Sequence, residues 1–156
     1  MINFFKIFFV SMMPLVELRL AVPMGIAMGL PVLPVYLVSI IGNMIPVPFI
    51  FLYARKLLLW GQDKVFIGKF FSFCLRKGER AGEKLKAKAN SGIIIALILF
   101  VGIPVPGTGA WTGTLAASIL NLDFKSSVIA CMLGVLISGI IMGLVSMGLF
   151  SFIGIT

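Results

Sequence analysis

The sequence predicts an all-α integral membrane protein built from two inverted repeats, each a re-entrant broken-helix hairpin followed by one transmembrane helix. Of its 156 residues, 60% are hydrophobic and 12% are charged, whereas soluble domains average about 25% charged residues. A water-soluble core cannot hold this much apolar surface. One basic block divides the chain into two apolar halves that share the same order of features. We therefore expect a single membrane domain over residues 1–156.

The first apolar segment, residues 2–30, is broken near its centre. It contains Pro14, the pair Glu17 and Arg19, and Pro23. Ionisable side chains inside a membrane cost roughly 2.5–3.5 kcal/mol each on insertion scales and usually face a cavity or pathway. Side chains two residues apart do not face each other on a helix, so a direct pair needs a broken backbone. Glu17 and Arg19 are therefore candidate substrate-binding residues, and the alternative is a pair that only stabilises packing.

Residues 33–53 carry no charge and are long enough for a transmembrane helix. Pro46 and Pro48 are expected to kink this helix or to end its regular part. Its one strongly polar side chain, Asn43, is a further candidate for the substrate-binding site.

The stretch 54–91 is predicted to form basic interfacial and cytoplasmic helices. It holds ten of the thirteen Lys and Arg residues, and the positive-inside tendency places it in the cytoplasm. Along 64–76, polar side chains recur every three to four residues opposite a Phe-rich face, a pattern typical of a helix lying on anionic headgroups. We therefore expect membrane lipids, and not nucleic acid, as the partner of the net charge of +8.

The second apolar half begins with residues 92–121, which are interrupted by "GIPVPGTGAWTG". Backbone amides at the start of a half-helix suit an anionic group. The alternative is a tight glycine-mediated helix crossing. The candidate substrate-binding residues here are Pro106, Gly107, Thr108, Gly109, Trp111 and Thr112. Residues 126–149 form the second predicted transmembrane helix, whose glycines and serines suit close packing in lipid.

The two halves match in register. At a separation of 92 residues, Pro14 meets Pro106 and Gly42 meets Gly134. Paired broken segments in corresponding halves point to a transporter site at the interface between repeats. If these segments are hairpins, the halves are inverted copies and Asp123 is cytoplasmic. If they are ordinary kinked spans, the repeats are parallel and Asp123 is external, and both arrangements remain open.

Other chemistries are not favoured by the composition. The chain has no His, and Cys74 and Cys131 fit neither a metal spacing nor a disulfide framework. No set of nucleophile and base is visible in the sequence. We therefore expect no enzyme activity, no cofactor and no metal site.

The segments "PLVELRLAVPMG" and "GIPVPGTGAWTG", with a basic block between them, resemble the small multidrug export protein family over nearly the whole chain. More distantly, the architecture resembles the DedA/VTT membrane proteins, which have two opposed re-entrant hairpins and are associated with moving lipids, including undecaprenyl phosphate. The resemblance implies that Glu17 and Arg19 correspond to charged residues of the first hairpin, and Pro106–Gly107 to the Pro-Gly of the second. It also implies a multi-pass protein of a bacterial or archaeal plasma (inner) membrane.

One departure from the DedA pattern concerns the second hairpin. DedA proteins usually place an arginine shortly after the Pro-Gly step, and this chain has Gly109 and Trp111 there. This departure argues against a phosphate clamp made of two arginines.

Three functions remain open. The first is a transporter or flippase for an amphiphilic or lipid-linked anionic substrate, such as a polyprenyl phosphate or a phospholipid, which requires Arg19. The second is a small proton-coupled exporter of cationic drugs, which requires Glu17. The third is a membrane assembly protein without transport. Two uninterrupted spans offer little wall around a cavity, so we also expect a homodimer, with the glycines of 126–149 available for its interface.

Overall fold

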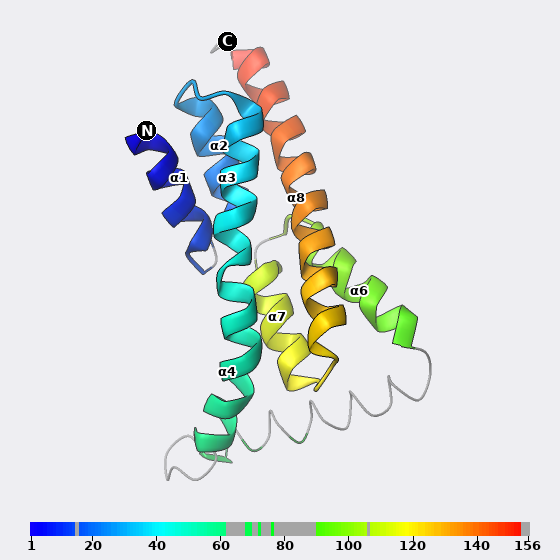
Figure 1. Cartoon of the computed structure of the whole chain (residues 1–156). Helices are drawn as coiled ribbons and strands as arrows, with labels where there is room; N and C mark the ends of the chain where they lie inside the picture. Colours follow the sequence, from blue (N-terminus) through cyan, green and yellow to red (C-terminus); the bar gives the residue numbers. More distant parts are fainter. Residues whose placement is uncertain are drawn as a thin grey trace.

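The computed structural model describes residues 1–14, 16–61, 68, 69, 72, 76, 90–105 and 107–153. These residues form helices and turns and contain no strand, which confirms the all-α prediction. The helices are α1 (Ile2–Met12), α2 (Glu17–Ala27), α3 (Val32–Met44), α4 (Pro46–Gly61), α6 (Asn90–Gly102), α7 (Ala110–Ile119) and α8 (Phe124–Ile153) (Figure 1). Most of the predicted interfacial and cytoplasmic stretch, 54–91, lies outside the described residues.

Two helical stretches of the described residues are long and apolar enough to cross a membrane. They are Val32–Ala54 and Phe124–Gly148, close to the two predicted transmembrane helices. The first of them is divided at Ile45, where α3 ends and α4 begins. Pro46 lacks the amide hydrogen that would continue the helical ladder at this point.

The first broken segment consists of α1 and α2. The chain leaves α1 after Met12 and enters α2 at Glu17, whose φ of 51° lies in the left-handed region. Pro23 lies inside α2 without ending it. The interruption in this segment therefore lies around Pro14, and Glu17 is placed in the first turn of the returning helix.

The two short helices of the first half pack on each other and on α3. Ile7, Ala21 and Val35 form a buried cluster that joins all three helices. Gly42 of α3 lies so close to α1 that a Cβ there would collide with the carbonyl group of Phe8. Close packing of this kind needs a residue without a side chain.

In the second half, α6 packs closely on α8. A Cβ at Gly134 of α8 would collide with Val101 and with the carbonyl oxygen of Ile98 in α6. Gly134 therefore allows α6 to approach α8 closely, as Gly42 allows α1 to approach α3. The main buried cluster, to which Leu18, Val101 and Val135 belong, joins helices of both halves.

Residues with positive φ recur at the separation of 92 residues. Glu17 has φ 51° and Gly109 has φ 129°; Gly29 has φ 70° and Asn121 has φ 53°. Glu17 is the first residue of its returning short helix and Gly109 immediately precedes the other, whereas Gly29 and Asn121 both follow a returning helix. Left-handed residues are uncommon outside glycine, so their recurrence in register indicates that the two halves turn in the same way.

The hydrogen bonds that end the two returning helices also match. The amide of Leu30 donates to the carbonyl of Gly25 at 3.1 Å, and the amide of Leu122 donates to the carbonyl of Ala117 at 3.0 Å. Both are the long closing bonds of a helix that ends in a left-handed residue. The two donors are again 92 residues apart, and so are the two acceptors.

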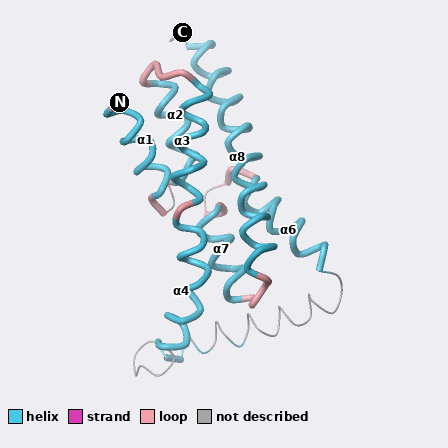
Figure 2. The backbone as a smooth tube through the Cα atoms, in the orientation of Figure 1, coloured by secondary structure: helices cyan, strands magenta, loops and turns pink. Residues whose placement is uncertain are grey.

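The helices of the second half run in directions opposite to those of their counterparts. In Figure 1, α1, α3 and α4 descend and α2 ascends, whereas α6 and α8 ascend and α7 descends. Figure 2 shows the loops that join the short helices near the middle of the molecule, and the turns before α3 and α8 at opposite ends.

Candidate functional site

The carboxylate of Glu17 binds the first amides of α7. The amide of Ala110 donates to its Oε2 at 3.2 Å, and the amide of Trp111 donates to its Oε1 at 3.0 Å. The first amides of a helix have no intrahelical acceptor, and the helix dipole favours negative charge beside them. Glu17 is only 2% exposed. It therefore caps a helix that lies more than ninety residues further along the chain.

The guanidinium of Arg19 binds the opposite helix end, where α6 stops. It donates through Nη1 to the carbonyl oxygen of Val105, and through Nη2 to that of Ile103 at 3.2 Å and to the hydroxyl of Thr108 at 2.7 Å. Cations are favoured near helix C-termini, whose last carbonyls lack helical partners. The acid and the base thus hold the two ends of the loop between α6 and α7.

Together these contacts connect the turn of the first half to the loop of the second, and we call them the joint. The joint consists of Glu17, Arg19, Ile103, Val105, Thr108, Ala110 and Trp111.

Gly109 allows the carboxylate of Glu17 to approach. A Cβ at Gly109 would overlap that carboxylate, and its φ of 129° is a conformation that side chains disfavour. The sequence indicates that the backbone amides at this half-helix start suit an anionic group. In the structure the group that comes near is a side chain of the chain itself.

The indole of Trp111 adds a hydrogen bond from the second half to the first. Its indole Nε1 donates to the carbonyl oxygen of Met12, the last residue of α1, at 3.1 Å. Arg19 and Trp111 are 92 residues apart, and each donates to a carbonyl that ends the first short helix of the other half. Trp111 therefore makes a contact that corresponds to that of Arg19.

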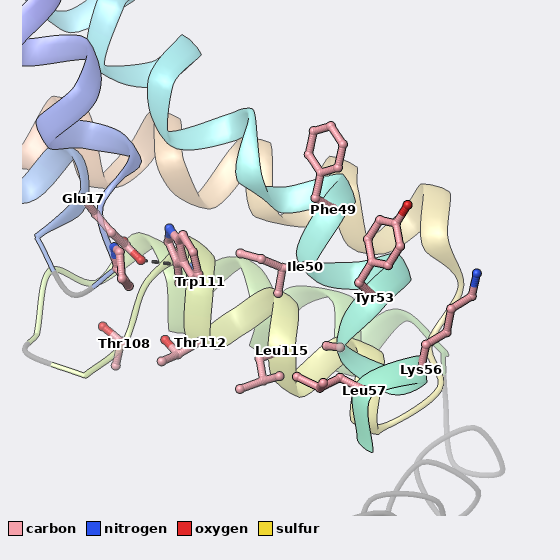
Figure 3. Close-up of a pocket in the computed structure, with 12 residues that line it drawn as sticks. Glu17, Phe49, Ile50, Tyr53, Lys56, Leu57, Thr108, Trp111, Thr112 and Leu115 are labelled. Carbon is pink, nitrogen blue, oxygen red and sulfur yellow. Dashed lines mark hydrogen bonds between the residues drawn. The ribbon is translucent and has the colours of Figure 1, made fainter. Parts of the chain in front are cut away.

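A groove of about 720 Å³ opens beside the joint, between α4 and α7 (Figure 3). Most of its wall is aliphatic or aromatic. Glu17 and Thr108 lie at one end of it, and Lys56 lies at the other. The ammonium nitrogen of Lys56 is 5.6 Å from the ring centre of Tyr53. The lining residues are Pro14, Glu17, Phe49, Ile50, Tyr53, Ala54, Lys56, Leu57, Thr108, Trp111, Thr112 and Leu115.

Four of the predicted site residues meet at this groove, namely Glu17, Thr108, Trp111 and Thr112. The hydroxyl of Thr112 lies 3.4 Å from the carbonyl oxygen of Gly109, within its own helix turn. Helix α7 positions Trp111 and Thr112, and the joint fixes α7 against the first half. The groove therefore has a rigid polar end and an apolar body.

The other predicted residues lie elsewhere. Arg19 belongs to the joint and is not among the residues that line the groove, and Gly107 and Gly109 do not line it either. Asn43 is fully buried in α3, and neither polar atom of its side chain has a hydrogen-bond partner. Pro106 lies outside the described residues. In the described part of the chain, no three His, Cys, Asp or Glu side chains gather as a metal site would require.

The sequence did not reveal the wall that α4 contributes. Phe49, Ile50 and Tyr53 read as ordinary residues of a transmembrane helix, and their place in the wall of the groove depends on the packing of α4 on α7. Lys56 carries a local signal, since it is among the first charges after the apolar span.

Comparisons with curated proteins and with solved structures found no match, and they lend no support to the more distant DedA/VTT resemblance. A family model does match, over residues 17–141, a range that includes the joint and all but one of the residues that line the groove. The chain therefore belongs to the family described as "Putative small multi-drug export protein".

Proposed function

We propose that this chain is a membrane transporter that exports lipophilic cations in exchange for protons, with the groove between α4 and α7 as its substrate site. The observation that carries the proposal is that Glu17, a buried acid, lies at one end of a groove whose wall is mostly apolar and aromatic. The description of the family supports an exporter.

The composition of the groove suits a lipophilic cation. Burying apolar surface gives about 25 cal/mol per Å², which the aliphatic and aromatic walls provide without any specific shape. Aromatic rings such as those of Trp111 and Tyr53 also attract cations through their faces. The carboxylate of Glu17 adds a charge of the required sign in a region of low dielectric constant.

Arg19 does not meet a substrate in the groove directly. Its guanidinium donates to two carbonyl oxygens and to Thr108, and it does not line the groove. The charge that a substrate meets at this end of the groove is therefore that of Glu17.

Exchange follows from the chemistry of a single carboxylate. Glu17 can balance a cationic substrate when it is ionised, or it can carry a proton, but not both. The amides of Ala110 and Trp111 hold its two oxygens in place. Arrival of a proton on Glu17 would remove the charge that retains the substrate and so favour its release.

We further propose that the chain consists of two inverted repeats with re-entrant short helices. The recurrence of positive φ residues and helix-ending bonds at a separation of 92 residues supports a duplication. The opposite directions of corresponding helices support inversion (Figure 1). In this arrangement the joint lies where the tips of the two hairpins meet, which is the expected depth of a transporter site.

A second candidate is the transport of an anionic amphiphile. The observation that favours it is Lys56, a cationic residue that lines the outer end of the groove. The hydroxyls of Thr108 and Thr112 would then serve as donors at the inner end. Such a substrate would place its charge at Lys56 and would not require Glu17 to be ionised.

The test uses a pair of ions that match in size and differ in charge, tetraphenylphosphonium and tetraphenylborate. The protein, in lipid nanodiscs and with Trp60 replaced by Phe, retains Trp111 as its one tryptophan. Its fluorescence then reports occupancy of the groove. We expect tetraphenylphosphonium to quench Trp111 in a saturable manner, and we expect its uptake into everted vesicles to require an inward-acidic pH gradient.

The decisive variant is Glu17→Gln, with Asp123→Asn as the matched control. Both remove a carboxylate charge, but Asp123 is exposed and is not among the residues that line the groove. Glu17→Gln should weaken the affinity for the cation by about tenfold or more, the usual scale for one buried charge partner, and should abolish dependence on pH. Saturable binding of tetraphenylborate alone, lost in Lys56→Met, would instead favour the second candidate.

A further inference from the structure

Thr108 belongs both to the groove and to the joint. Its side chain lines the groove, and its hydroxyl accepts a hydrogen bond from Arg19 at 2.7 Å. The same hydroxyl lies 2.9 Å from the carbonyl oxygen of Ile103 and 2.8 Å from that of Val105. These are the two carbonyls that Arg19 also binds. The hydroxyl of Thr108 is therefore one acceptor of Arg19 and also contacts the other two.

This geometry leaves the hydroxyl of Thr108 with one free acceptor position. A hydroxyl has one hydrogen and two lone pairs; the hydrogen is committed to a carbonyl and one lone pair to Arg19. The second lone pair can face the positive charge of a cation in the groove. A cation placed there also lies close to the guanidinium of Arg19, and like charges repel strongly in a region of low dielectric constant.

We propose that Thr108 is a positioning residue that transmits occupancy of the groove to Arg19, so that a bound cation loosens the joint between the two halves. This inference rests on the proposed function, because it takes a cation as the occupant. The empty groove keeps Arg19 on its three acceptors and the halves together. The occupied groove weakens the hold of Arg19 on the end of α6 and permits the halves to separate.

Thr112 supplies a matched control for Thr108. Both threonines line the groove, but the hydroxyl of Thr112 bonds only within its own helix turn, to Gly109. Removing either hydroxyl changes the wall of the groove by the same atom. Only the removal of Thr108's hydroxyl changes the joint.

The experiment measures amide hydrogen exchange over residues 103–111 in nanodiscs, with and without tetraphenylphosphonium. In wild type the cation should speed exchange there. In Thr108→Val, the amides of this stretch should exchange about tenfold faster without ligand, as expected for the loss of a hydrogen bond to a charged group. Adding the cation to this variant should not raise the exchange rate further. Thr108→Ser should behave as wild type, and without ligand Thr112→Val should exchange at the wild-type rate over 103–111. In transport, Thr108→Val should lower kcat and leave KM within about twofold.

Three results overturn this inference. The first is an exchange rate in Thr108→Val equal to that of wild type. The second is a rise in exchange in Thr112→Val as large as that in Thr108→Val. The third is a wild type that binds the cation without any change in exchange over 103–111. Failure of the proposed function looks different, because then tetraphenylphosphonium does not quench Trp111 at all. In that case the comparison of Thr108→Val with Thr112→Val without ligand still decides whether Thr108 holds the joint.

Discussion

The carboxylate of Glu17 occupies the space in which a side chain at Gly109 would lie. These two residues hold corresponding places in the two halves, 92 residues apart, and both have positive φ. One half supplies a long acidic side chain and the other supplies none. The contact between the halves is therefore asymmetric.

Gly109→Ala should destabilise the protein strongly. The new Cβ would overlap the carboxylate of Glu17 at a φ that alanine disfavours, and strain and overpacking together cost about 2–5 kcal/mol. Gly107→Ala is the control, because its φ of 87° is also positive but a Cβ there meets nothing within 4 Å. Thermal unfolding in detergent measures the difference. Equal effects of the two changes would show that Glu17 is not packed against Gly109.

Arg19→Lys should be only partly tolerated. Lysine keeps the charge but loses the planar fork that reaches several acceptors at once. We expect a melting temperature between those of wild type and Arg19→Met, since Ile103, Val105 and Thr108 would share one ammonium group. Lys125→Met, a change of an exposed cation, should leave the melting temperature nearly unchanged. Arg19→Met as stable as wild type would remove Arg19 from the joint.

Local patterns in the sequence located the breaks but not the partners across them. Prolines and the unusual charge pair marked the interruptions around Pro14 and 103–109, because helix breakers act on their own neighbours. The pairing of Glu17 with the start of α7 depends on how distant helices pack, and no local pattern encodes it. A half-helix start that suits an anion was predicted, and an anion belonging to the chain itself occupies it.

The residues of the groove also show that local patterns do not identify contacts between distant helices. Thr108, Trp111 and Thr112 stood out because they interrupt an apolar segment. The wall from α4, including Phe49, did not, since apolar residues of a span look alike whether they face lipid or a site. Asn43 stood out as the polar residue of its span, yet its place is inside α3 and away from the groove.

Trp111→Phe should loosen the end of α1. The change keeps an aromatic wall in the groove and removes the indole donor to the carbonyl of Met12, a loss of about 1 kcal/mol. Hydrogen exchange should rise at the end of α1 and stay unchanged in the middle of α8. Trp111→Arg should restore protection there if Trp111 truly corresponds to Arg19. An unchanged end of α1 in Trp111→Phe would contradict the proposed correspondence.

Asp123 should make stability depend on pH at the acidic end. The amide and the hydroxyl of Ser126 donate to its carboxylate and hold its pKa below the ordinary value. A depressed pKa in the folded state stabilises the protein above the ordinary pKa, and this contribution is lost as the pH falls through the folded value. Thermal unfolding from about pH 6 downward should show a steeper loss in wild type than in Asp123→Asn. Parallel curves would mean that this cap contributes nothing.

The topology of the chain gives the last prediction. The turn before α3 and the turn before α8 lie at opposite ends of the molecule (Figure 2), so inverted re-entrant halves place them on opposite sides of the membrane. Single cysteines at Met28 and Lys125, both exposed, should therefore react with an impermeant thiol reagent from opposite sides, Lys125→Cys from the cytoplasm. The background carries Cys74→Ala and Cys131→Ala, and its unfolding should match wild type. Labelling of both positions from outside would favour four kinked spans in parallel repeats, and the groove would then need a different route to each side.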